Sequence, residues 1–481
     1  MNKKFYLTTA IPYVNAAPHI GHALEFVQAD CVARYQKIRE DKYNTLLLSG
    51  SDENALKNVQ AAEQENIPIQ DFVNKNSQLF EDLAKKLNVK FDVFQRGSST
   101  QHYKSSQELW KRCFKNGDIY EETYSGLYCV GCEAFYERGE LNERGECFEH
   151  PGKQLEEVSE KNWFFKLNKY GDRLLKIIEG KDKEFHLEII PEKRRHEVLS
   201  FLNLGLKNIS ISRSNKRAKN WGVPVPNDDT QRIYVWFDAL NIYQSGVGFN
   251  WNPAKYKKWW PADLHIIGKG ILRFHAIYWP AFLLSAKLQP PKKIFVHGYI
   301  TVDGQKISKT IGNVIDPFVL LDKYRVDPIR YYLLREIPAH SDGDFSERRF
   351  KEVYNADLAN GLGNLVARIA KLIEIRSPSY GPDKTSSFSF DIKPWLENFQ
   401  FDEALKAIWA RIKGLDHCLE ESKPWEKSGL HTQVRWKELI DGVRQIAFDL
   451  QPFLPKTAER IQEQFAGPKI KSGAPLFPRL C

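Results

Sequence analysis

An ordered alternation of strand-like and helix-like segments is the feature that most restricts the fold of this chain. FYLTTAI (5–11) has the pattern of a strand, residues 18–39 place apolar side chains at helical spacing, and NTLLLSG (44–50) is a short apolar run typical of a buried parallel strand. Parallel neighbours need a crossover connection, so this order predicts a doubly wound α/β sheet. The α/β pattern returns later in RIYVWFDAL (232–240), ADLHIIGKG (262–270) and KKIFVHGYITV (292–302).

Residues 116–231 interrupt this pattern with turn-rich stretches, a cluster of cysteines and the basic run SRSNKRAKNWG (212–222). Beyond residue 350 the apolar positions follow helical spacing, which predicts a helix bundle. The predicted helices of that bundle are 351–375, 401–422 and 432–449. We therefore expect five segments: the first half of a nucleotide-binding sheet (1–115), an inserted domain (116–231), the second half of the sheet (232–325), a linker (326–350) and a helical domain (351–481).

Composition limits the class of protein. The 481 residues carry a formal net charge of +9, which favours anionic partners such as nucleic acid or nucleotides but is weak evidence alone. No apolar run is long enough to cross a membrane, and the first residues lack the apolar core of a signal peptide. Seven cysteines, an odd number, do not form a secreted disulfide framework. We expect a cytoplasmic protein without a membrane partner.

The stretch PHIGH (18–22) lies where the first predicted strand gives way to the first predicted helix. Pro18 suits the first helical position, and His19 and His22, three residues apart, share one face of the first turn. The free N–H groups of a helix start bind anions, and Gly21 leaves room for a phosphate or a flat ring. We expect a cradle for a nucleotide triphosphate. Two surface histidines on an ordinary helix are the alternative.

A second polar element follows the last predicted strand. HGYITVDGQKISKTIGN (297–313) turns through Asp303-Gly304 and carries Lys306, Ser308 and Lys309 on a polar loop. Two lysines that flank a serine can follow a pyrophosphate group as charge builds up on it. A solvated basic loop is the alternative interpretation.

The pairing of PHIGH with KISKT, in this order, resembles the HIGH and KMSKS signatures of class I aminoacyl-tRNA synthetases. With TTAIPYVNAAPHIGHA, YVWFDALNIY, GKGILRFHAIYWPAF and HGYITVDGQKISKT, nearly the whole chain is similar to methionyl-tRNA synthetases. The resemblance implies an α/β, Rossmann-like doubly wound parallel sheet, interrupted by a zinc-knuckle connective-peptide domain and followed by an all-α anticodon-binding bundle. It also implies ATP-dependent ligation of L-methionine to initiator and elongator tRNA(Met), with Mg²⁺ and without DNA.

The same resemblance assigns roles to numbered residues. Asp52 is implied to receive the amino group of methionine, which agrees with the preference of a cationic amine for a carboxylate. Aromatic rings suit a flexible, polarizable thioether. The implied methionine pocket contains Ala10, Ile11, Tyr13, Asp52, Trp236, Tyr243 and His275, the implied catalytic groups are His19, His22, Lys306 and Lys309, and the ATP site adds Gly21, Gly268 and Ser308.

The cysteine cluster has the spacing of a metal site. C-x2-C-x14-C-x2-H places three thiolates and one imidazole in two knuckle-like pairs, using Cys129, Cys132, Cys147 and His150. Such a set fills a tetrahedral zinc site and leaves no open position, so the zinc would be structural. A degenerate, metal-free knuckle is the alternative.

The helical region carries a candidate RNA-reading set. Asn364 and Arg368 lie four apart beside an apolar stripe, and Trp425 follows a proline. RNA readers stack splayed bases on aromatic rings and bind their edges with polar groups. The resemblance implies that these three residues read the CAU anticodon. Surface helix residues and an anchoring tryptophan are the alternative.

The chain departs from the family pattern at four positions. Asn54 stands where histidine is common, and Gly270 stands where aspartate is common, which puts the network around Arg213 in doubt. Ile307 and Thr310 are milder changes. Two other functions therefore stay open: another adenylate-forming nucleotidyltransferase, and a zinc-containing RNA-binding module that has lost catalysis.

Overall fold

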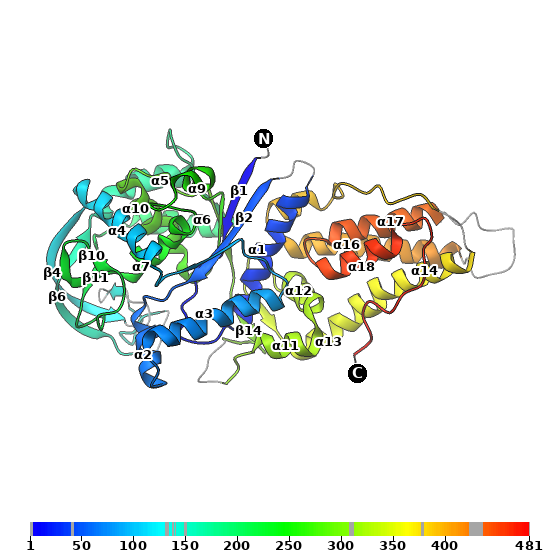
Figure 1. Cartoon of the computed structure of the whole chain (residues 1–481), viewed down its shortest axis with the longest axis horizontal. Helices are drawn as coiled ribbons and strands as arrows, with labels where there is room; N and C mark the ends of the chain where they lie inside the picture. Colours follow the sequence, from blue (N-terminus) through cyan, green and yellow to red (C-terminus); the bar gives the residue numbers. More distant parts are fainter. Residues whose placement is uncertain are drawn as a thin grey trace.

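The computed structural model describes residues 3–39, 43–129, 134–136, 139, 141–148, 152–306, 312–376, 380–422 and 436–480. Within them, a central parallel sheet has the strand order β3–β2–β1–β12–β13–β7. Two of its strands, β1 and β2, are labelled in Figure 1. Because β1 pairs with β2 on one side and β12 on the other, the two α/β parts of the sequence form one sheet, as predicted. Its strands are β1 (Lys4–Thr8), β2 (Asn44–Ser51), β3 (Val93–Arg96), β7 (Glu188–Ile190), β12 (Leu264–Gly268) and β13 (Lys293–His297).

Both faces of the sheet are buried, which explains the apolar runs in its strands. Leu47 and Ile266 point into one core with α1, α3 and α12, whereas Leu48 and Ile267 point into a second core with α4, α7, α8 and α10. Helices therefore cover both faces, as a doubly wound sheet requires. These helices are α1 (Ile20–Ile38), α2 (Leu56–Gln64), α3 (Ile69–Lys86), α4 (Thr100–Lys115), α7 (Val235–Leu240), α8 (Ile242–Ser245), α9 (Pro253–Trp259), α10 (Trp279–Ser285), α11 (Pro317–Tyr324) and α12 (Val326–Arg335).

Antiparallel sheets occupy much of the stretch that interrupts the α/β pattern. One has the order β5–β4–β6–β8 and another the order β10–β11–β9. The long β4 and β6 strands form a curved arm at the left of Figure 1. Strand β7 also belongs to this stretch, yet it pairs with β13 at the edge of the central sheet. The elements are β4 (Ile119–Cys129), β5 (Ala134–Tyr136), β6 (Glu156–Phe165), α5 (Gly171–Glu179), α6 (Glu192–Asn203), β8 (Ile209–Ser210), β9 (Ser212–Ser214), β10 (Pro224–Val225) and β11 (Asp228–Ile233).

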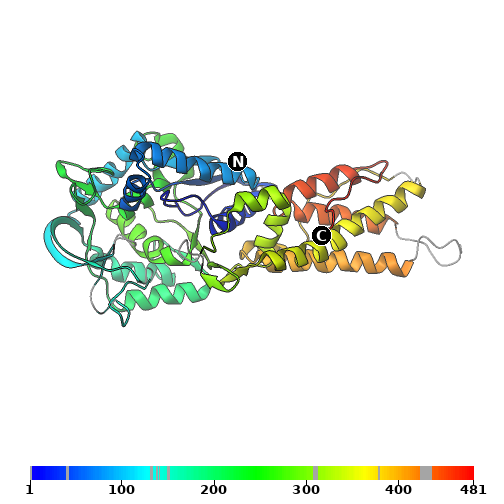
Figure 2. The same ribbon diagram turned by 90° about the horizontal axis from the view of Figure 1, so that it is seen from below.

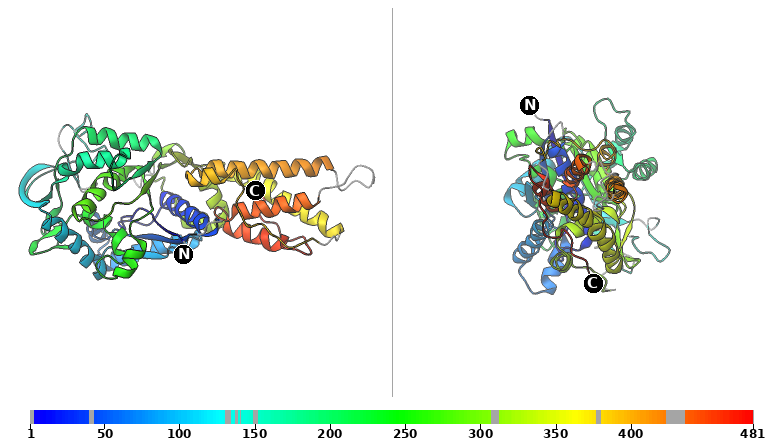
Figure 3. Two further views of the ribbon diagram at one scale, coloured as in Figure 1. Left: turned by 90° about the horizontal axis from the view of Figure 1, so that it is seen from above. Right: turned by 90° about the vertical axis from the view of Figure 1, so that its right-hand side faces the viewer.

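The C-terminal region is helical and projects away from the α/β part as an elongated bundle (Figures 2 and 3). The stripe predicted over 351–375 is a composite of α13, a π-helix and α14, so its phase shifts within the element. The bundle shares one core with α1 and α12. Its elements are α13 (Glu347–Val353), the π-helix (Tyr354–Gly363), α14 (Asn364–Arg376), α15 (Lys393–Glu397), α16 (Phe401–Ser422), α17 (Trp436–Leu450) and α18 (Pro455–Phe465).

Two sequence expectations need correction. The first strand ends at Thr8 and not at residue 11, because the chain after it leaves the sheet toward Asp52. Residues 232–240, expected to open the second half of the central sheet, add no strand to it: they form the end of the antiparallel strand β11 and the short helix α7. Among the described helices, none has the length and apolar character needed to cross a membrane.

Candidate active site

Helix α1 begins with a capping arrangement built from the two histidines of PHIGH. Nδ1 of His19 accepts a hydrogen bond from the Gly21 N–H (3.1 Å), and Nδ1 of His22 accepts one from the His19 N–H (3.1 Å). His19 is the N-cap, so the helix starts at Ile20. Pro18 therefore precedes the cap, and its predicted place as the first helical residue is wrong: an imidazole nitrogen can accept the backbone N–H that a serine or aspartate cap would take.

This arrangement fixes the protons of both rings. Because each Nδ1 accepts a hydrogen bond, we infer that His19 and His22 each carry their proton on Nε2. The ring centroids lie 4.0 Å apart, so both Nε2–H groups are presented from the same helical turn. Burial, with smaller contributions from His19 and His297, holds the pKa of His22 well below its usual value of 6.5. At neutral pH His22 is a neutral donor at a helix start, where anions are stabilised.

Gly21 has a steric role between the two histidines. A Cβ at this position would lie 2.9 Å from Cε1 of the His19 ring, which is closer than carbon atoms pack. A side chain would therefore displace the ring that caps the helix. The close neighbour of Gly21 in the structure is thus His19 itself.

The chain after β1 runs beside the end of β2 and brings Asp52 into the site. The Asp52 N–H donates to the Pro12 carbonyl (2.8 Å), and Tyr13 forms a parallel bridge with Asp52. On the other side, Nδ2 of Asn58 donates to the Asp52 carbonyl (2.9 Å). Only 3% of Asp52 is exposed, so it lies buried next to the segment that carries Ala10 and Ile11.

Aromatic side chains form a wall opposite this segment. Trp236 on α7 contacts Tyr13 edge to face, and Tyr243 on α8 donates from its hydroxyl to Nε2 of His275 (2.8 Å). Nδ1 of His275 donates to the Ile271 carbonyl (2.9 Å), which fixes the tautomer that accepts from Tyr243. The structure therefore brings together the residues predicted for the methionine pocket.

Two residues of this region escaped sequence reasoning. Phe274 stacks on Trp236 with ring centroids 3.7 Å apart and planes 3° apart. The Glu25 carboxylate accepts from the Ala10 N–H (2.7 Å) and contacts Nε2 of His297 (2.9 Å), so it joins the end of β1 to the end of β13. A signal for Glu25 exists, because it is an acidic residue within a run of buried apolar positions on α1.

The loop with the two lysines is described only at its start. Strands β14 (Ile300–Val302) and β15 (Gln305–Lys306) form a hairpin through Asp303 and Gly304, which have φ angles of 49° and 74°. Both angles are positive, as a two-residue Asp-Gly turn requires. The hairpin also pairs with β16 (Gly343–Phe345). The side chain of Lys306, together with Ser308 and Lys309, lies outside the described residues, and Gly268 ends β12 next to the His297 ring.

The predicted zinc set is only partly described. Cys129 at the end of β4 and Cys147 are both buried, and Sγ of Cys147 lies 3.5 Å from the Tyr136 hydroxyl. Cys132 and His150 lie outside the described residues. Within the described part of the chain, no group of three or more potential ligands gathers around a common point.

Two of the three predicted anticodon residues are described. Asn364 begins α14 and is exposed. Arg368, one turn later, pairs with Asp416 (2.9 Å) and Glu420 (2.6 Å) on the neighbouring α16. Trp425 lies outside the described residues.

Buried imidazoles in this site predict an acid-labile fold. Burial lowers the pKa of His275 to about 4 despite its hydrogen bond to Ile271, and holds the pKa values of His22 and His265 well below 6.5. The unfolded chain protonates these groups near pH 6.5, whereas the folded chain keeps them neutral. The free energy of unfolding therefore has its full value above pH 6.5 and falls as the pH drops toward 4. The shifted pKa of His275 alone accounts for a fall of about 3 kcal/mol.

Urea unfolding at pH 7, 6, 5 and 4.5 checks this dependence. His275→Gln should reduce the slope of the free energy of unfolding against pH between pH 6.5 and 4, because it removes one buried titrating group. The exposed His196, which lies on α6, gives the matched control, and His196→Gln should leave the slope unchanged. An identical slope in His275→Gln and the parent chain would refute the assignment.

Known proteins are similar to this chain in sequence and in fold. The family model described as "tRNA synthetases class I (M)" matches residues 5–370. Methionine–tRNA ligase of Thermotoga maritima is 40% identical over 95% of this chain and 74% of its own length. The corresponding ligases of Clostridium acetobutylicum (38% identity, 99% of this chain, 78% of theirs) and Rhizobium meliloti (39%, 99% and 98%) are similarly close.

A solved structure agrees over the whole length. Mycobacterium tuberculosis methionyl-tRNA synthetase, bound by methionyl-adenylate, superposes with a TM-score of 0.89 and 34% identity, covering 99% of this chain and 100% of that chain. The apo form of the same enzyme gives a TM-score of 0.82 and 32% identity over 100% of this chain and 99% of that chain. The chain belongs to the class I tRNA synthetases, in the methionyl-tRNA synthetase family.

Proposed function

We propose that this chain is a methionine–tRNA ligase that first forms methionyl-adenylate and then transfers the methionyl group to tRNA(Met). In the first step a carboxylate oxygen of methionine attacks the α-phosphorus of ATP in line. The bond from that phosphorus to the bridging oxygen breaks, and pyrophosphate leaves with both electrons of that bond. Mg²⁺ accompanies ATP and offsets the charge of its phosphates. No side chain becomes covalently attached, so positioning and electrostatic stabilisation supply the catalysis.

The juxtaposition of three groups at the carboxyl ends of β1, β2 and β12 carries this proposal. A histidine-capped helix start lies beside a buried carboxylate and an aromatic wall, which matches the needs of a triphosphate, an ammonium group and a thioether. The indole N–H of Trp236 is buried with no hydrogen-bond partner among the described residues, so a ligand could still engage it. We assign methionine to Ala10, Ile11, Tyr13, Asp52, Trp236, Tyr243 and His275, and ATP to His19, Gly21, His22, Gly268, Lys306, Ser308 and Lys309.

Transfer to tRNA uses the remaining regions. The 2′-hydroxyl oxygen of the terminal adenosine is the first acceptor, as expected of class I. It attacks the methionyl carbonyl carbon and gives up its proton, the acyl–phosphate bond of the adenylate breaks, and AMP leaves with both electrons of that bond. In our proposal residues 116–231 guide the acceptor end, 326–350 contact the stem, and 351–481 read the anticodon of initiator and elongator tRNA(Met) through Asn364, Arg368 and Trp425. The buried Cys129 and Cys147 thiols suit a soft cation, so we assign structural Zn²⁺ to them with Cys132 and His150. A cytoplasmic location stays a prediction.

Replacing Arg368 tests the anticodon assignment. Its guanidinium is held by Asp416 and Glu420, so it is presented at a fixed place on the bundle. Arg368→Gln should lower kcat/KM for charging tRNA(Met) by roughly 5- to 150-fold, the cost of losing a base-reading contact, while methionine-dependent ATP–pyrophosphate exchange stays unchanged. The exposed Arg112 is the matched control, because Arg112→Gln removes a similar arginine–glutamate pair, with Glu108, on α4 and lies outside the regions proposed to contact tRNA. Equal losses in both variants would contradict the assignment.

Charging of purified tRNA(Met) with labelled methionine tests the whole proposal. Acid-stable label should accumulate on tRNA(Met), and a transcript whose CAU anticodon is replaced should be charged far more slowly. Charging that ignores the anticodon would remove the role proposed for the helical domain. Failure to charge either transcript would overturn the ligase assignment.

A further inference from the structure

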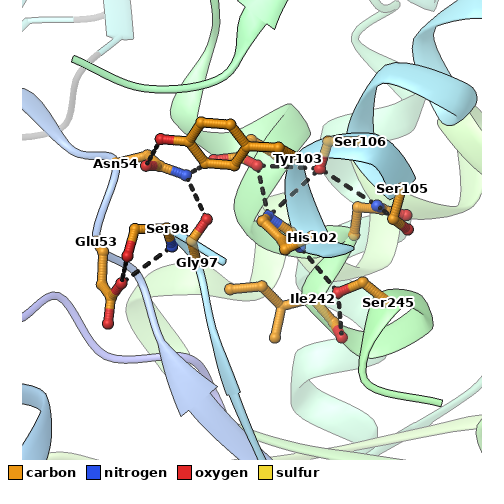
Figure 4. A network of polar contacts seen from close by, with 12 residues as sticks. Glu53, Asn54, Gly97, Ser98, His102, Tyr103, Ser105, Ser106, Ile242 and Ser245 are labelled. Atoms are coloured by element: carbon orange, nitrogen blue, oxygen red, sulfur yellow. Dashed lines mark hydrogen bonds and ion pairs between the residues drawn. The ribbon is translucent and has the colours of Figure 1, made fainter. Parts of the chain in front are cut away.

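A buried polar network links the end of β2 to helices α4 and α7 (Figure 4). At its centre the amide of Asn54 uses both of its N–H donors and one acceptor position on its oxygen. Nδ2 donates to the Gly97 carbonyl (2.9 Å) and to Oδ2 of Asp238 (2.7 Å), while Oδ1 accepts from the Tyr103 hydroxyl (3.1 Å). Only 8% of Asn54 is exposed, so none of these bonds is replaced by bulk water at low cost.

The Asp238 carboxylate is held equally firmly on its other oxygen. Nε2 of His102 lies 2.6 Å from Oδ1, and the Ser106 hydroxyl donates to the same oxygen (3.0 Å). The second ring nitrogen of His102 contacts the Ser245 hydroxyl on α8 (2.8 Å). Asp238 and His102 are 1% and 0% exposed. Helices α4, α7 and α8 are therefore tied together around one carboxylate, which makes Asp238 a fixed point.

Glu53, the neighbour of Asn54, is held by residues in a different part of the fold. The Glu53 carboxylate accepts from Ser51 (2.6 Å) and Ser77 (2.7 Å), and Arg96 and Ser98 also bind it. These contacts join the segment to β2, α3 and the end of β3. They do not reach α7. The hydrogen bond from Asn54 to Asp238 joins the segment after β2 to α7, the helix that carries Trp236.

The two ends of that bond each lie two residues from a proposed methionine ligand. Asp52, assigned to the ammonium group, precedes Asn54 by two, and Trp236, assigned to the side chain, precedes Asp238 by two. A methionine molecule must satisfy both at once. A change in the separation of the two segments therefore weakens both contacts together, and a misplacement of about 1 Å already matters for such sites.

We propose that Asn54 is a positioning residue for methionine: through Asp238 it sets the distance between the Asp52 carboxylate and the Trp236 indole. This inference rests on the methionine site assigned under the proposed function. In this proposal Asn54 affects the affinity for methionine and not the binding of the ATP phosphates. Its side-chain hydrogen bonds are made with residues on the pocket side and not with the helix start at His19.

Methionine binding by isothermal titration and ATP–pyrophosphate exchange test the inference together. Asn54→Asp keeps the side-chain size but removes both N–H donors and sets a carboxylate against Asp238. It should raise the Kd and KM for methionine about tenfold or more, with the KM for ATP changed less than twofold. Asn54→Ala should give a smaller rise of the same kind.

Asn355 provides the matched control. Its amide makes two hydrogen bonds, both to backbone, with the Leu480 carbonyl (3.0 Å) and N–H (2.9 Å), and it lies in the helical region. Asn355→Ala should lower the melting temperature by a similar amount as Asn54→Ala while leaving the KM for methionine unchanged. An equal rise of the methionine KM in both variants would mean a general loss of stability and would overturn the inference.

A double-mutant cycle of Asn54→Ala with Asp238→Ala shows whether Asn54 acts through that carboxylate. The double variant should bind methionine no more weakly than the worse single variant, because both changes break the same bond. Additive losses would overturn the inference. If Asn54→Asp does not fold, Ser106→Ala perturbs Asp238 from α4 and should raise the methionine KM about threefold; an unchanged KM overturns the proposal. A parent chain that does not bind methionine would instead refute the proposed function.

Discussion

Replacing His22 with alanine should lower the rate of methionyl-adenylate formation by about 10²–10³-fold while changing the KM for methionine little. The reason is the geometry of the helix start. Nδ1 of His22 is occupied by the His19 N–H, so Nε2–H is the donor that remains for the phosphates. A preorganised donor aimed at developing charge is worth about 10²–10³ in kcat. Pre-steady-state formation of adenylate, followed by rapid quench, measures the effect directly.

Two further variants separate charge stabilisation from helix capping. His22→Gln keeps an N–H donor and should recover part of the lost rate. His340, a half-buried histidine that contacts the Asn398 carbonyl, is a matched control, and His340→Ala should leave the rate unchanged. Because the pKa of His22 is held well below 6.5, the contribution of this residue should be constant from pH 6.5 upward. A full rate in His22→Ala would contradict the account of the site.

The second large effect is expected at Asp52. Asp52→Ala should raise the KM for methionine by about 30- to 1,000-fold, because removing one partner of a buried, hydrogen-bonded charge pair costs roughly 2–4 kcal/mol. Asp52 is only 3% exposed, so solvent screens little of the attraction between its carboxylate and an ammonium group placed beside it. The KM for ATP should change much less. Steady-state ATP–pyrophosphate exchange over a range of methionine concentrations gives both values.

Another buried carboxylate shows whether the effect is local. Asp327 on α12 accepts from the Thr457 N–H (2.6 Å) and hydroxyl (2.7 Å), far along the chain from the pocket. Asp327→Asn should lower stability and leave the KM for methionine unchanged. A KM that rises equally in Asp52→Ala and Asp327→Asn would show that the methionine site is not where we place it.

Local patterns in the sequence sufficed for much of the fold. Continuous apolar runs such as residues 44–50 identify strands that are buried on both faces, and helical spacing identifies α16 with its observed bounds. Other features depend on contacts between distant residues. Strand β7 has three residues and joins the central sheet only by pairing with β13, and nothing in a three-residue stretch indicates its partner. The π-helix before α14 likewise shifts the phase of the apolar stripe, and the spacing of the apolar residues in the sequence does not indicate where that shift occurs.

The site likewise has residues that local sequence patterns identify and contacts that only the folded chain shows. Motif residues such as His19 and Trp236 could be placed because short stretches around them resemble a family. The Asn54–Asp238 bond spans 184 positions, and the Phe274–Trp236 stack joins two separate helices, so both emerge only when the chain is folded. The Pro18 prediction failed for a local reason, since a histidine cap is rarer than a serine or aspartate cap and carries no strong signal.

The most direct test of the central claim is ATP–pyrophosphate exchange by the purified protein with methionine, leucine, isoleucine and cysteine supplied one at a time. Exchange requires the helix start, the buried carboxylate and the aromatic wall to act as one site, and it needs no tRNA. We predict that methionine supports rapid exchange and that the other three amino acids do so poorly. Exchange driven by another amino acid in preference to methionine, or none with any of the four, would contradict the account.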